Sequence, residues 1–474
     1  MKENGKFKVA DLNLLFKPRS LAVIGVSSNP HRGGGLLWQR LIEQGYNGGK
    51  YPVSIRHDEI GGDRCYRSVR DIEEVVDLAI IAVPAATVEK VVNECADKGI
   101  KHIVIHSAGF AELGEEGAGL QQRLFDIARR NGIRIVGPNC MGLFCPDVQM
   151  NTIVEPVDNI KQLSGGVAFS GQSGWATEEF IVGGSSRGLQ FSTVVSSGNQ
   201  ADLDTLDYIT FFNSDPETRV ISAYVEGLKR GREFLNVARE ISASKPILIC
   251  KSGLSAAGAR AVMSHTGSVA GSREIWLSAA KGAGIVTADG LEDLIDLTVA
   301  FSIPIYPKGR KVGILVEAGG GGAVASDACE RVGLEVKPFS ESLKEKIKEF
   351  LTEYLPPFSG ISNPLDFIWL PADDTAFTIC VRSIEMLAEE VDSIVYMTYQ
   401  PFNSPELRPR YIKELCRLRD EFNTPIFVVP PHPSREAVAM QEFTMAGLPA
   451  FYSFGRATKS IAAIAKYQEW RAIG

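Results

Sequence analysis

The chain has 474 residues, of which 45% are hydrophobic and 23% are charged. At roughly 100 to 200 residues per domain this length favours about three globular domains, and the composition excludes a mainly disordered or fibrous protein. The 50 basic and 57 acidic residues give a net charge of −7 with no long basic run, which argues against nucleic acid as a partner.

The sequence gives no sign of a membrane or a secretory route. It contains no apolar stretch of about 18 residues, and the segment from Met1 to Lys6 lacks the apolar core of a signal peptide. The eight cysteines are scattered without a Cys-x-x-Cys pair, which predicts buried thiols rather than disulfides or a metal site. We therefore expect a cytoplasmic protein with no membrane partner and no bound metal.

Short β-rich apolar runs alternate with segments of helical periodicity from end to end, the pattern of βαβ units. The sequence therefore predicts an α/β fold of three doubly wound parallel-sheet domains, at residues 1–152, 153–303 and 304–474. Strands are expected in the first domain at 21–24, 51–55, 78–83, 102–105 and 133–136. In the second they are expected at 166–169, 192–195, 220–224, 246–250 and 284–286. In the third they are expected at 312–316, 393–397, 426–429 and 450–454, before a last helix that ends near Trp470.

The first strand runs into a glycine-rich turn, residues 25–35, and then into a helix, the place where an α/β sheet binds a phosphorylated nucleotide. Ser27 stands where the dinucleotide pattern has its second glycine, and the second strand leads to Ser54 and Arg56 rather than to a ribose-binding acid. These departures disfavour NAD. Arg32 and Arg56 instead suit additional phosphate groups such as those of coenzyme A, although a purely structural turn is an alternative.

Small and turn residues also follow the later strands of the first domain. The carboxyl ends of parallel strands line one crevice, so these loops predict a shared ligand site, although each alone is equally typical of an ordinary connection. The candidate cofactor-binding residues are Gly25, Ser27, Ser28, Pro30, Arg32, Gly34, Ser54, Arg56, Val83, Pro84, Ala85, Ser107, Ala108, Gly109, Glu112, Asn139 and Cys140.

The second domain opens with a small-residue loop before a helix expected to begin near Ala176. Free N–H groups at such a helix start, with hydroxyls beside them, predict a cradle for an anion, and a plain N-cap by Ser173 is the alternative. A second small-residue loop follows the next strand and can face the same anion. The candidate phosphate-binding residues of the two loops are Ser170, Gly171, Gln172, Ser173, Gly174, Ser197, Gly198 and Asn199.

A segment rich in Gly, Ser and Ala, residues 251–271, contains His265 as its only histidine. A lone histidine is more often without a role, and the other five histidines of the chain are interpreted so. His265 differs because Glu226 stands at the end of a nearby predicted strand. A carboxylate on one imidazole nitrogen fixes the tautomer and leaves the other nitrogen nucleophilic, so these two are the candidate catalytic residues.

Taken together, these residues resemble the nucleoside-diphosphate-forming acyl-CoA synthetases, the succinyl-CoA synthetase superfamily, and in particular the α subunit of ADP-forming acetyl-CoA synthetases. Residues 264–268, Ser-His-Thr-Gly-Ser, resemble the phosphohistidine loop, and Glu226 matches its supporting glutamate. Residues 170–174 match the helix start that holds the phosphohistidine, and 137–140 match a hallmark of the CoA domain. The resemblance implies a Rossmann-like CoA-binding domain, a flavodoxin-like phosphohistidine ligase domain and a third flavodoxin-like domain.

The resemblance also implies an activity: interconversion of acyl-CoA, ADP and phosphate with a carboxylic acid, CoA and ATP, through an acyl phosphate and a phosphohistidine at His265. Coenzyme A and phosphate are the ligands expected on this chain, with a small carboxylic acid or acyl-CoA as substrate. No P-loop pattern or ATP-grasp segment occurs, so ATP or ADP with Mg is expected on a separate ATP-grasp β subunit, in an α2β2 hetero-oligomer.

Two departures from the family pattern stand out. Residues 52–55 read Pro-Val-Ser-Ile instead of Pro-Val-Asn-Pro, and residues 318–322 read Ala-Gly-Gly-Gly-Gly instead of Ala-Gly-Gly-Pro-Gly.

A CoA-binding regulatory or scaffold protein without ligase turnover is an alternative, and the intact His265 and Glu226 argue against it. A nicotinamide-dependent oxidoreductase is a second alternative, disfavoured by Ser27 and Arg56.

Overall fold

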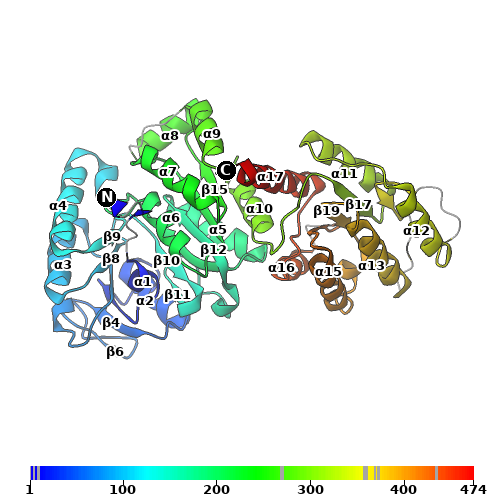
Figure 1. Cartoon of the computed structure of the whole chain (residues 1–474). Coiled ribbons are helices and arrows are strands. Elements are labelled where there is room, and N and C mark those ends of the chain that lie inside the picture. Colours follow the sequence, from blue (N-terminus) through cyan, green and yellow to red (C-terminus); the bar gives the residue numbers. More distant parts are fainter. Residues whose placement is uncertain are drawn as a thin grey trace. The chain divides into compact units, whose positions relative to one another are not determined.

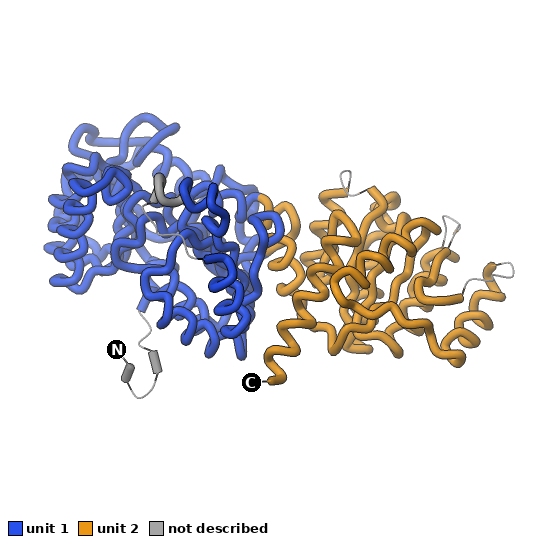
Figure 2. The backbone as a smooth tube through the Cα atoms, turned by 90° about the horizontal axis from the view of Figure 1, so that it is seen from above, with its two compact units in different colours: residues 1–182, 190–294 blue, residues 183–189, 295–474 orange. Residues whose placement is uncertain are grey.

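The structure is a computed structural model of the whole chain. It describes residues 11–266, 272–355, 361–367, 370, 374–432 and 436–473, with backbone alone for 262–266 and for the two short strands β1 (Lys2–Glu3) and β2 (Lys6–Phe7). The chain folds into two compact units, coloured separately in Figure 2: residues 1–182 with 190–294, and residues 183–189 with 295–474.

The first unit contains a five-stranded parallel sheet in the order β4-β3-β7-β8-β9 (Figure 1). Every residue of β3, β7 and β8 is buried, because helices cover both faces of a parallel sheet. After β3, the next strand in the chain, β4, lies on one side of β3, and the following strands, from β7 on, lie on the other side. Such a reversal of strand order opens a crevice at the carboxyl ends of the strands. The strands are β3 (Ser20–Ile24), β4 (Gly49–Val53), β7 (Leu78–Ile81), β8 (His102–Ile105) and β9 (Arg134–Val136). The helices are α1 (Asn13–Phe16), α2 (Gly33–Glu43), α3 (Ala85–Lys98) and α4 (Glu115–Asn131).

A seven-stranded sheet completes this unit, in the order β11-β10-β13-β12-β14-β15-β16. Its five later strands are parallel, whereas β10 pairs antiparallel with both β11 and β13. The strands are β10 (Gly142–Cys145), β11 (Met150–Asn151), β12 (Ser164–Gly171), β13 (Phe191–Ser196), β14 (Val220–Val225), β15 (Ile247–Lys251) and β16 (Val286–Ala288). The helices are α5 (Gly174–Ser186), α6 (Thr205–Ser214), α7 (Gly231–Ser242), α8 (Ala256–Thr266) and α9 (Arg273–Gly282). Small elements are β5 (Glu59–Ile60), β6 (Asp63–Arg64) and the 3-10 turns at Val69–Asp71, Ala111–Leu113, Pro146–Val148 and Ile160–Leu163.

Strands β10 and β11 were not expected from the sequence. Their residues lie inside the predicted first domain, yet they pair into the second sheet, and one hydrophobic core with members such as Val136, Leu143 and Val195 runs between the two sheets. The two sheets therefore form one compact unit. The boundaries of the three domains at 1–152, 153–303 and 304–474 stay a prediction.

The second unit has a four-stranded parallel sheet in the order β18-β17-β19-β20. The strands are β17 (Val312–Val316), β18 (Leu365–Asp366), β19 (Ser393–Met397) and β20 (Ile426–Val429). The helices are α10 (Leu291–Phe301), α11 (Gly319–Arg331), α12 (Glu341–Thr352), α13 (Asp374–Ala388), α14 (Gln400–Asn403), α15 (Arg408–Phe422), α16 (Ala437–Met445) and α17 (Phe454–Ile473). The first residues of α10, 291–294, belong to the first unit.

The strand expected at 450–454 is wrong. Only Ala450 makes a bridge to Val428 of β20, and helix α17 already begins at Phe454. The cause is local: the Ser453 hydroxyl accepts a hydrogen bond from the Arg456 N–H at 3.3 Å, a helix-capping contact that turns the chain away from the sheet.

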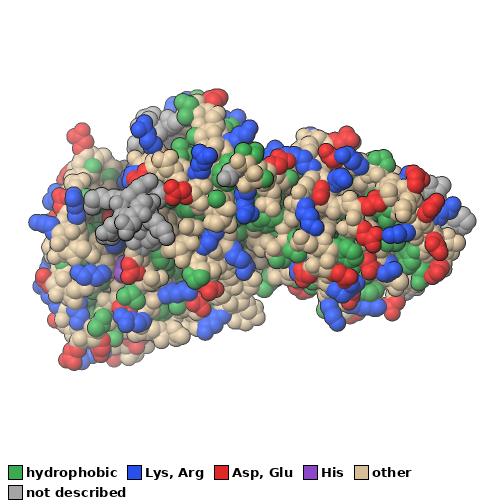
Figure 3. All heavy atoms as spheres, viewed as in Figure 1, with side chains coloured by type: hydrophobic (Ala, Val, Ile, Leu, Met, Phe, Trp, Pro, Cys, Tyr) green, Lys and Arg blue, Asp and Glu red, His purple; other side chains and the backbone are tan. Residues whose placement is uncertain are grey.

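The surface and the helices agree with the charge and hydropathy of the sequence. On the face drawn in Figure 3, Lys and Arg side chains are intermixed with Asp and Glu over both units. Among the described residues, no helix combines the length and the apolar character needed to cross a membrane.

A buried ion network lies inside the second unit. The Arg187 guanidinium donates to Asp296 Oδ1 and to the Ala450 carbonyl oxygen, both at 2.8 Å, and Arg456 pairs with Asp296 Oδ2. The Arg187 and Asp296 side chains are only 4% and 5% exposed. One carboxylate therefore balances two guanidinium groups, and its loss would leave a buried charge without compensation.

Replacing Asp296 by Asn is expected to lower the free energy of unfolding by about 3 kcal/mol, the usual penalty for removing one partner of a buried ion pair. The matched control is Glu469→Gln, which breaks the more exposed Arg310–Glu469 pair and should lower it by less than about 1 kcal/mol. Urea unfolding of the three proteins gives the comparison. Equal losses in the two variants would contradict a structural role for the buried network.

Candidate functional site

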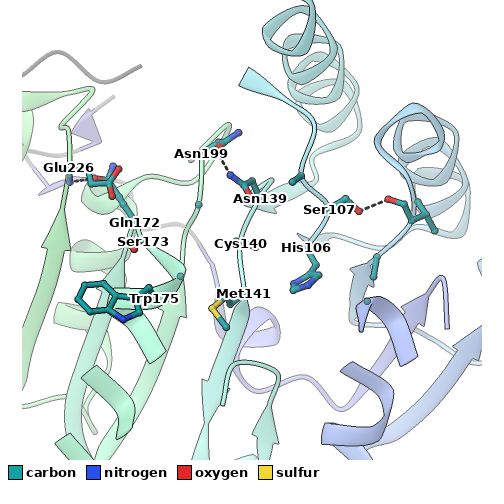
Figure 4. A pocket seen from close by; sticks show the side chains of 16 residues that line it. His106, Ser107, Asn139, Cys140, Met141, Gln172, Ser173, Trp175, Asn199 and Glu226 are labelled. Carbon is teal, nitrogen blue, oxygen red and sulfur yellow. Dashed lines mark hydrogen bonds between the residues drawn. The ribbon is translucent and has the colours of Figure 1, made fainter. Parts of the chain in front are cut away.

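A cavity of about 630 Å³ lies in the first unit, where loops at the carboxyl ends of strands from both sheets come together (Figure 4). The convergence of strand ends that the sequence predicts is therefore present, and it involves the two sheets rather than one. Two walls can be distinguished: one from the loops after β7, β8 and β9, and one from the loops after β12, β13 and β14.

The first wall contains the candidate cofactor-binding residues Val83, Ser107, Ala108, Asn139 and Cys140. The Ser107 hydroxyl donates to the Val83 carbonyl oxygen and so ties the end of β8 to the end of β7. Cys140 donates through Sγ to the Ile105 carbonyl oxygen at 3.3 Å, and burial raises its pKa to about 12. The raised pKa favours the protonated thiol, which is a poor nucleophile, and the contact of Cys140 with CoA stays a prediction.

The glycine-rich turn packs against this wall. A Cβ at Gly25 would lie 2.5 Å from the Ala82 carbonyl oxygen, and one at Gly34 would lie 2.3 Å from the Gly25 carbonyl oxygen. Gly25 also has a φ of +99°, which disfavours any other residue. Helix α2 therefore starts close to the strand ends, with its first residue, Gly33, on the cavity wall and no side chain capping its N-terminus.

The other candidate cofactor-binding residues do not line this cavity. The buried Ser54 hydroxyl accepts from the N–H groups of Arg56 and His57 at 3.4 Å, so it shapes the turn after β4. Arg32 and Arg56 are exposed, where a diffusible anion can reach them. The residues of this group are Gly25, Ser27, Ser28, Pro30, Arg32, Gly34, Ser54, Arg56, Pro84, Ala85, Gly109 and Glu112, and their contact with CoA stays a prediction.

The second wall holds the start of helix α5. The Ser173 hydroxyl accepts from the Ala176 N–H at 3.3 Å, so the N-cap considered as an alternative is present. The cap leaves the earlier N–H groups of Gly174 and Trp175 without an acceptor among the described residues. Gln172, Ser173 and Gly174 all line the cavity, so the helix N-terminus faces it and can receive an anion as well.

Three of the candidate phosphate-binding residues do not reach the cavity wall. Ser170 is 1% exposed and lies within β12, so its hydroxyl is enclosed in the sheet. The Ser197 hydroxyl donates to the Gly171 carbonyl oxygen at 3.1 Å and accepts from Gln200 Nε2 at 2.9 Å. Ser197 and the Gly171 carbonyl group therefore tie two strand ends together, whereas the buried Ser170 hydroxyl has no hydrogen-bond partner among the described residues. Gly198 and Asn199 line the cavity, and their contact with phosphate stays a prediction.

Glu226 follows β14 and is only 6% exposed, yet it lines the cavity. Within the described residues, no hydrogen bond or salt bridge reaches its carboxylate, although the positive charge of Lys251 attracts it. A buried carboxylate without a hydrogen bond is costly, which indicates that a hydrogen-donating group completes the site. His265 belongs to helix α8, but its side chain lies outside the described residues, so its contact with Glu226 stays a prediction.

A polar network joins the two walls. Asn139 Nδ2 donates to Asn199 Oδ1 at 3.4 Å, and Asn199 Nδ2 donates to Glu112 Oε2 and to Gln121. A Cβ at Gly198 would lie 2.4 Å from the carbonyl oxygens of Asn139 and of its neighbour Pro138, so only glycine allows the loops to approach this closely. Glu112 thus belongs to this polar network, which we call the seam between the walls (Glu112, Gln121, Asn139 and Asn199), and it does not line the cavity.

Several residues that line the cavity were not predicted from the sequence: Gly33, Ala82, His106, Met141 and Trp175. Burial lowers the pKa of His106, against an opposing interaction with the Cys140 backbone, and so favours the neutral ring. Trp175 is 65% exposed at the start of α5. Each of the five lining residues that were not predicted is the sequence neighbour of a predicted site residue. Including the residue on either side of each predicted one would therefore have identified all five.

Comparison with known proteins places this architecture in a class. The CoA binding domain family matches residues 19–146, and the succinyl-CoA ligase like flavodoxin domain family matches residues 164–301. The first match covers the five-stranded sheet, and the second covers the five parallel strands, β12 to β16, of the seven-stranded sheet. The fold and the site thus define a CoA ligase of the succinyl-CoA synthetase superfamily.

Proteins that match nearly the whole of this chain identify the family within that superfamily. The chain is 37% identical over 475 residues to the α subunit of acetate–CoA ligase (ADP-forming) I of Pyrococcus furiosus, covering 97% of this chain and 98% of the relative. It is 35% identical to acetate–CoA ligase (ADP-forming) I of Archaeoglobus fulgidus, covering 96% of this chain and 63% of that longer protein. The dinucleotide forming acetyl-coenzyme A synthetase 1 of Ca. Korarchaeum cryptofilum, solved with phosphate and ADP, matches with a TM-score of 0.85 and 32% identity, over 98% of each chain. The chain belongs to the family of ADP-forming acetate–CoA ligase α subunits.

The carboxylate in the seam makes a pH-dependent contribution to stability. Burial would raise the pKa of Glu112, but hydrogen bonds from Asn199 and from the backbone N–H groups of Gly109 and Phe110 outweigh it and lower the pKa below its ordinary value. A carboxyl group with a lowered pKa stabilises the fold above its unfolded pKa of about 4.3, and the contribution disappears as the pH falls through the folded pKa.

Replacing Glu112 by Gln is therefore expected to destabilise the first unit by a constant amount above about pH 5 and by progressively less at lower pH. Urea unfolding of both proteins across the pH range measures the difference. Asn199→Ala removes one donor to the carboxylate and should reduce the pH-dependent part. A difference that does not change with pH would show that the ionised carboxylate contributes nothing.

Proposed function

We propose that this chain is the α subunit of an ADP-forming acyl-CoA synthetase, an acid–thiol ligase that interconverts acyl-CoA, ADP and phosphate with a carboxylic acid, CoA and ATP. The observation that carries the proposal is the cavity in which the buried carboxylate of Glu226 and the open N-terminus of α5 meet the strand ends of the CoA-binding-domain sheet. Membership of the acetate–CoA ligase family supports a small carboxylic acid as substrate.

In the first step, a phosphate oxygen attacks the thioester carbonyl carbon of acyl-CoA. The carbon–sulfur bond breaks, CoA leaves as a thiolate that takes up a proton, and an acyl phosphate remains. The first-turn N–H groups of α5 are suited to hold the phosphate, because they and the helix dipole place partial positive charge at Gly174 and Trp175. CoA reaches the cavity from the wall that contains Val83, Ser107 and Ala108.

In the second step, a ring nitrogen of His265 attacks the phosphorus of the acyl phosphate, and the carboxylate of the acid leaves. Glu226 accepts a hydrogen bond from the other ring nitrogen, which fixes the tautomer and stabilises the positive charge that develops on the ring. In the third step, a β-phosphate oxygen of ADP takes the phosphoryl group from His265 and forms ATP. Dividing the transfer in this way keeps the thioester and the nucleotide in separate sites.

The nucleotide module belongs to a partner in this proposal. The sequence holds no P-loop pattern, and the Archaeoglobus fulgidus relative has more than a third of its length beyond the part that this chain matches. We place ATP or ADP with Mg on a separate ATP-grasp β subunit in an α2β2 hetero-oligomer. All eight cysteines of this chain are free, which supports a reducing compartment such as the cytoplasm.

Labelling of His265 tests the mechanism. The purified chain is incubated with labelled ATP and Mg, with and without a candidate ATP-grasp β subunit, and we expect acid-labile, base-stable label only when the partner is present. The His265→Ala variant should remain unlabelled, whereas His432→Ala, in the second unit, should be labelled as wild type. Protection of the chain from heat by CoA, without label in the presence of a verified partner, would favour the regulatory or scaffold protein instead.

Replacing Glu226 by Gln tests the supporting carboxylate. The variant keeps the shape of the side chain but loses its charge, so we expect phosphorylation of His265 to slow by roughly 10²-fold, the size of effect seen when one electrostatic stabiliser is removed. CoA binding, measured by thermal shift, should not change. A full rate of phosphorylation in this variant would exclude a role for the charge of Glu226.

A further inference from the structure

The amide of Gln172 lines the cavity but has no hydrogen-bonding capacity left for a ligand. Its Oε1 accepts from the N–H groups of Glu226 and Gly227, the second at 2.9 Å. Its Nε2 donates to the Gly227 carbonyl oxygen at 3.0 Å and to Gln200 Oε1 at 2.9 Å. An amide has two N–H donors and one oxygen with two lone pairs, so all four positions are in use.

These contacts hold the backbone of Glu226 from one side, and Lys251 holds it from the other. Lys251 Nζ donates to the Glu226 carbonyl oxygen at 2.8 Å and to the Ser252 carbonyl oxygen at 2.6 Å. Both backbone groups of Glu226 are thus fixed by side chains from neighbouring strand ends. Its carboxylate is the one polar group of the residue without a hydrogen bond among the described residues, and the charge of Lys251 attracts it.

The Gln172 amide is itself anchored in the interior. Gln200 is 2% exposed, and its Nε2 donates to Ser197 Oγ at 2.9 Å and to Thr205 Oγ1 at 3.1 Å. A chain of hydrogen bonds therefore runs from helix α6 through Gln200 and Gln172 to the turn that carries Glu226 (Figure 4 shows its Gln172 end). A fully satisfied buried network of this kind is rigid, because breaking any member leaves another polar group unpaired.

We infer that Gln172 is a positioning residue that acts through Glu226, fixing the backbone from which the catalytic carboxylate projects, and that it does not bind phosphate. Lys251 holds the same backbone at its carbonyl group. The inference rests on the proposed function only for the role of the carboxylate, because the hydrogen bonds that fix Glu226 exist whatever reaction the cavity performs.

The first test needs no catalysis. Replacing Gln172 by Met keeps the length of the side chain and removes all four hydrogen bonds, so amide hydrogen exchange should accelerate at Glu226 and Gly227 in the full chain. The matched control is Gln190→Met, whose amide donates to the Gln162 carbonyl oxygen at the opposite end of β13, and which should leave that exchange unchanged. Unchanged exchange at Glu226 and Gly227 in a folded Gln172→Met variant would overturn the inference.

The second test separates positioning from phosphate binding. In the presence of the β subunit, Gln172→Met should lower kcat by roughly 10²-fold, the usual effect of a misplaced catalytic group, with the KM for phosphate within about twofold of wild type. The effect should largely vanish when Glu226 is already Gln, because two residues that act as one unit are not additive. A raised KM for phosphate, or losses that multiply in the double variant, would show that Gln172 binds the ligand directly.

Lys251→Met provides an independent variant should Gln172→Met fold poorly. It releases the Glu226 carbonyl group and removes a positive charge that attracts the Glu226 carboxylate, so we expect kcat to fall at least as much, with unchanged KM for phosphate. The two proposals can fail separately. If the wild-type protein has protected amides at Glu226 and Gly227 but His265 is never phosphorylated, the proposed function is wrong and the hydrogen bonds that position Glu226 are still confirmed.

If His265 of the wild type is phosphorylated, and the Gln172 and Lys251 variants turn over as fast as the wild type, only the positioning role is wrong.

Discussion

The candidate site depends on a close contact between two backbone segments, residues 137–139 and 197–201. The N–H groups of Asn199 and Ala201 donate to the carbonyl oxygens of Pro138 and Gly137 at 3.0 and 2.9 Å. The segments can approach this closely because Gly198 has no side chain. One segment follows the last strand of the first sheet and the other follows β13 of the second, so this contact fixes the carboxyl ends of the two sheets against each other.

That contact explains why the cavity has two chemically different walls. The first wall is held by hydrogen bonds among its own strand ends, such as the one from Ser107 to Val83, and burial raises the pKa of its thiol, Cys140. The second wall carries the features suited to phosphoryl chemistry: the N-terminus of α5 and the carboxylate of Glu226. A substrate that spans both walls can therefore present a thioester from one side to a phosphoryl-transfer centre on the other.

The sequence was sufficient for most of the parallel strands and for most of the residues that line the cavity, because parallel strands have buried apolar runs and their carboxyl ends share one edge. The sequence did not predict β10, a strand of only four residues. Its position is set by antiparallel pairing with β13 in the seven-stranded sheet, and no local sequence pattern encodes such a long-range contact. Ser170 and Ser197 do not line the cavity, since a hydroxyl at the end of a strand can point into the sheet or out of it, which the sequence does not reveal. Gln172 was predicted to bind phosphate, and only the structure shows that its amide is fully occupied by hydrogen bonds within the chain.

The two features of the second wall make opposite demands on a ligand. The open N-terminus of α5 attracts an anion, whereas the buried carboxylate of Glu226, next to it on the same wall, repels one. A phosphoryl group at the helix start and the Glu226 carboxylate are therefore compatible only when a proton-carrying group separates them. In the proposed mechanism the imidazole of His265 is that group, with one nitrogen donating to the carboxylate and the other bonded to the phosphorus. In that proposal Glu226 orients the histidine, and the N-terminus of α5 binds the phosphoryl group. A fixed backbone at Glu226 then matters as well as its charge, because a carboxylate displaced toward the helix would weaken the anion site at the start of α5.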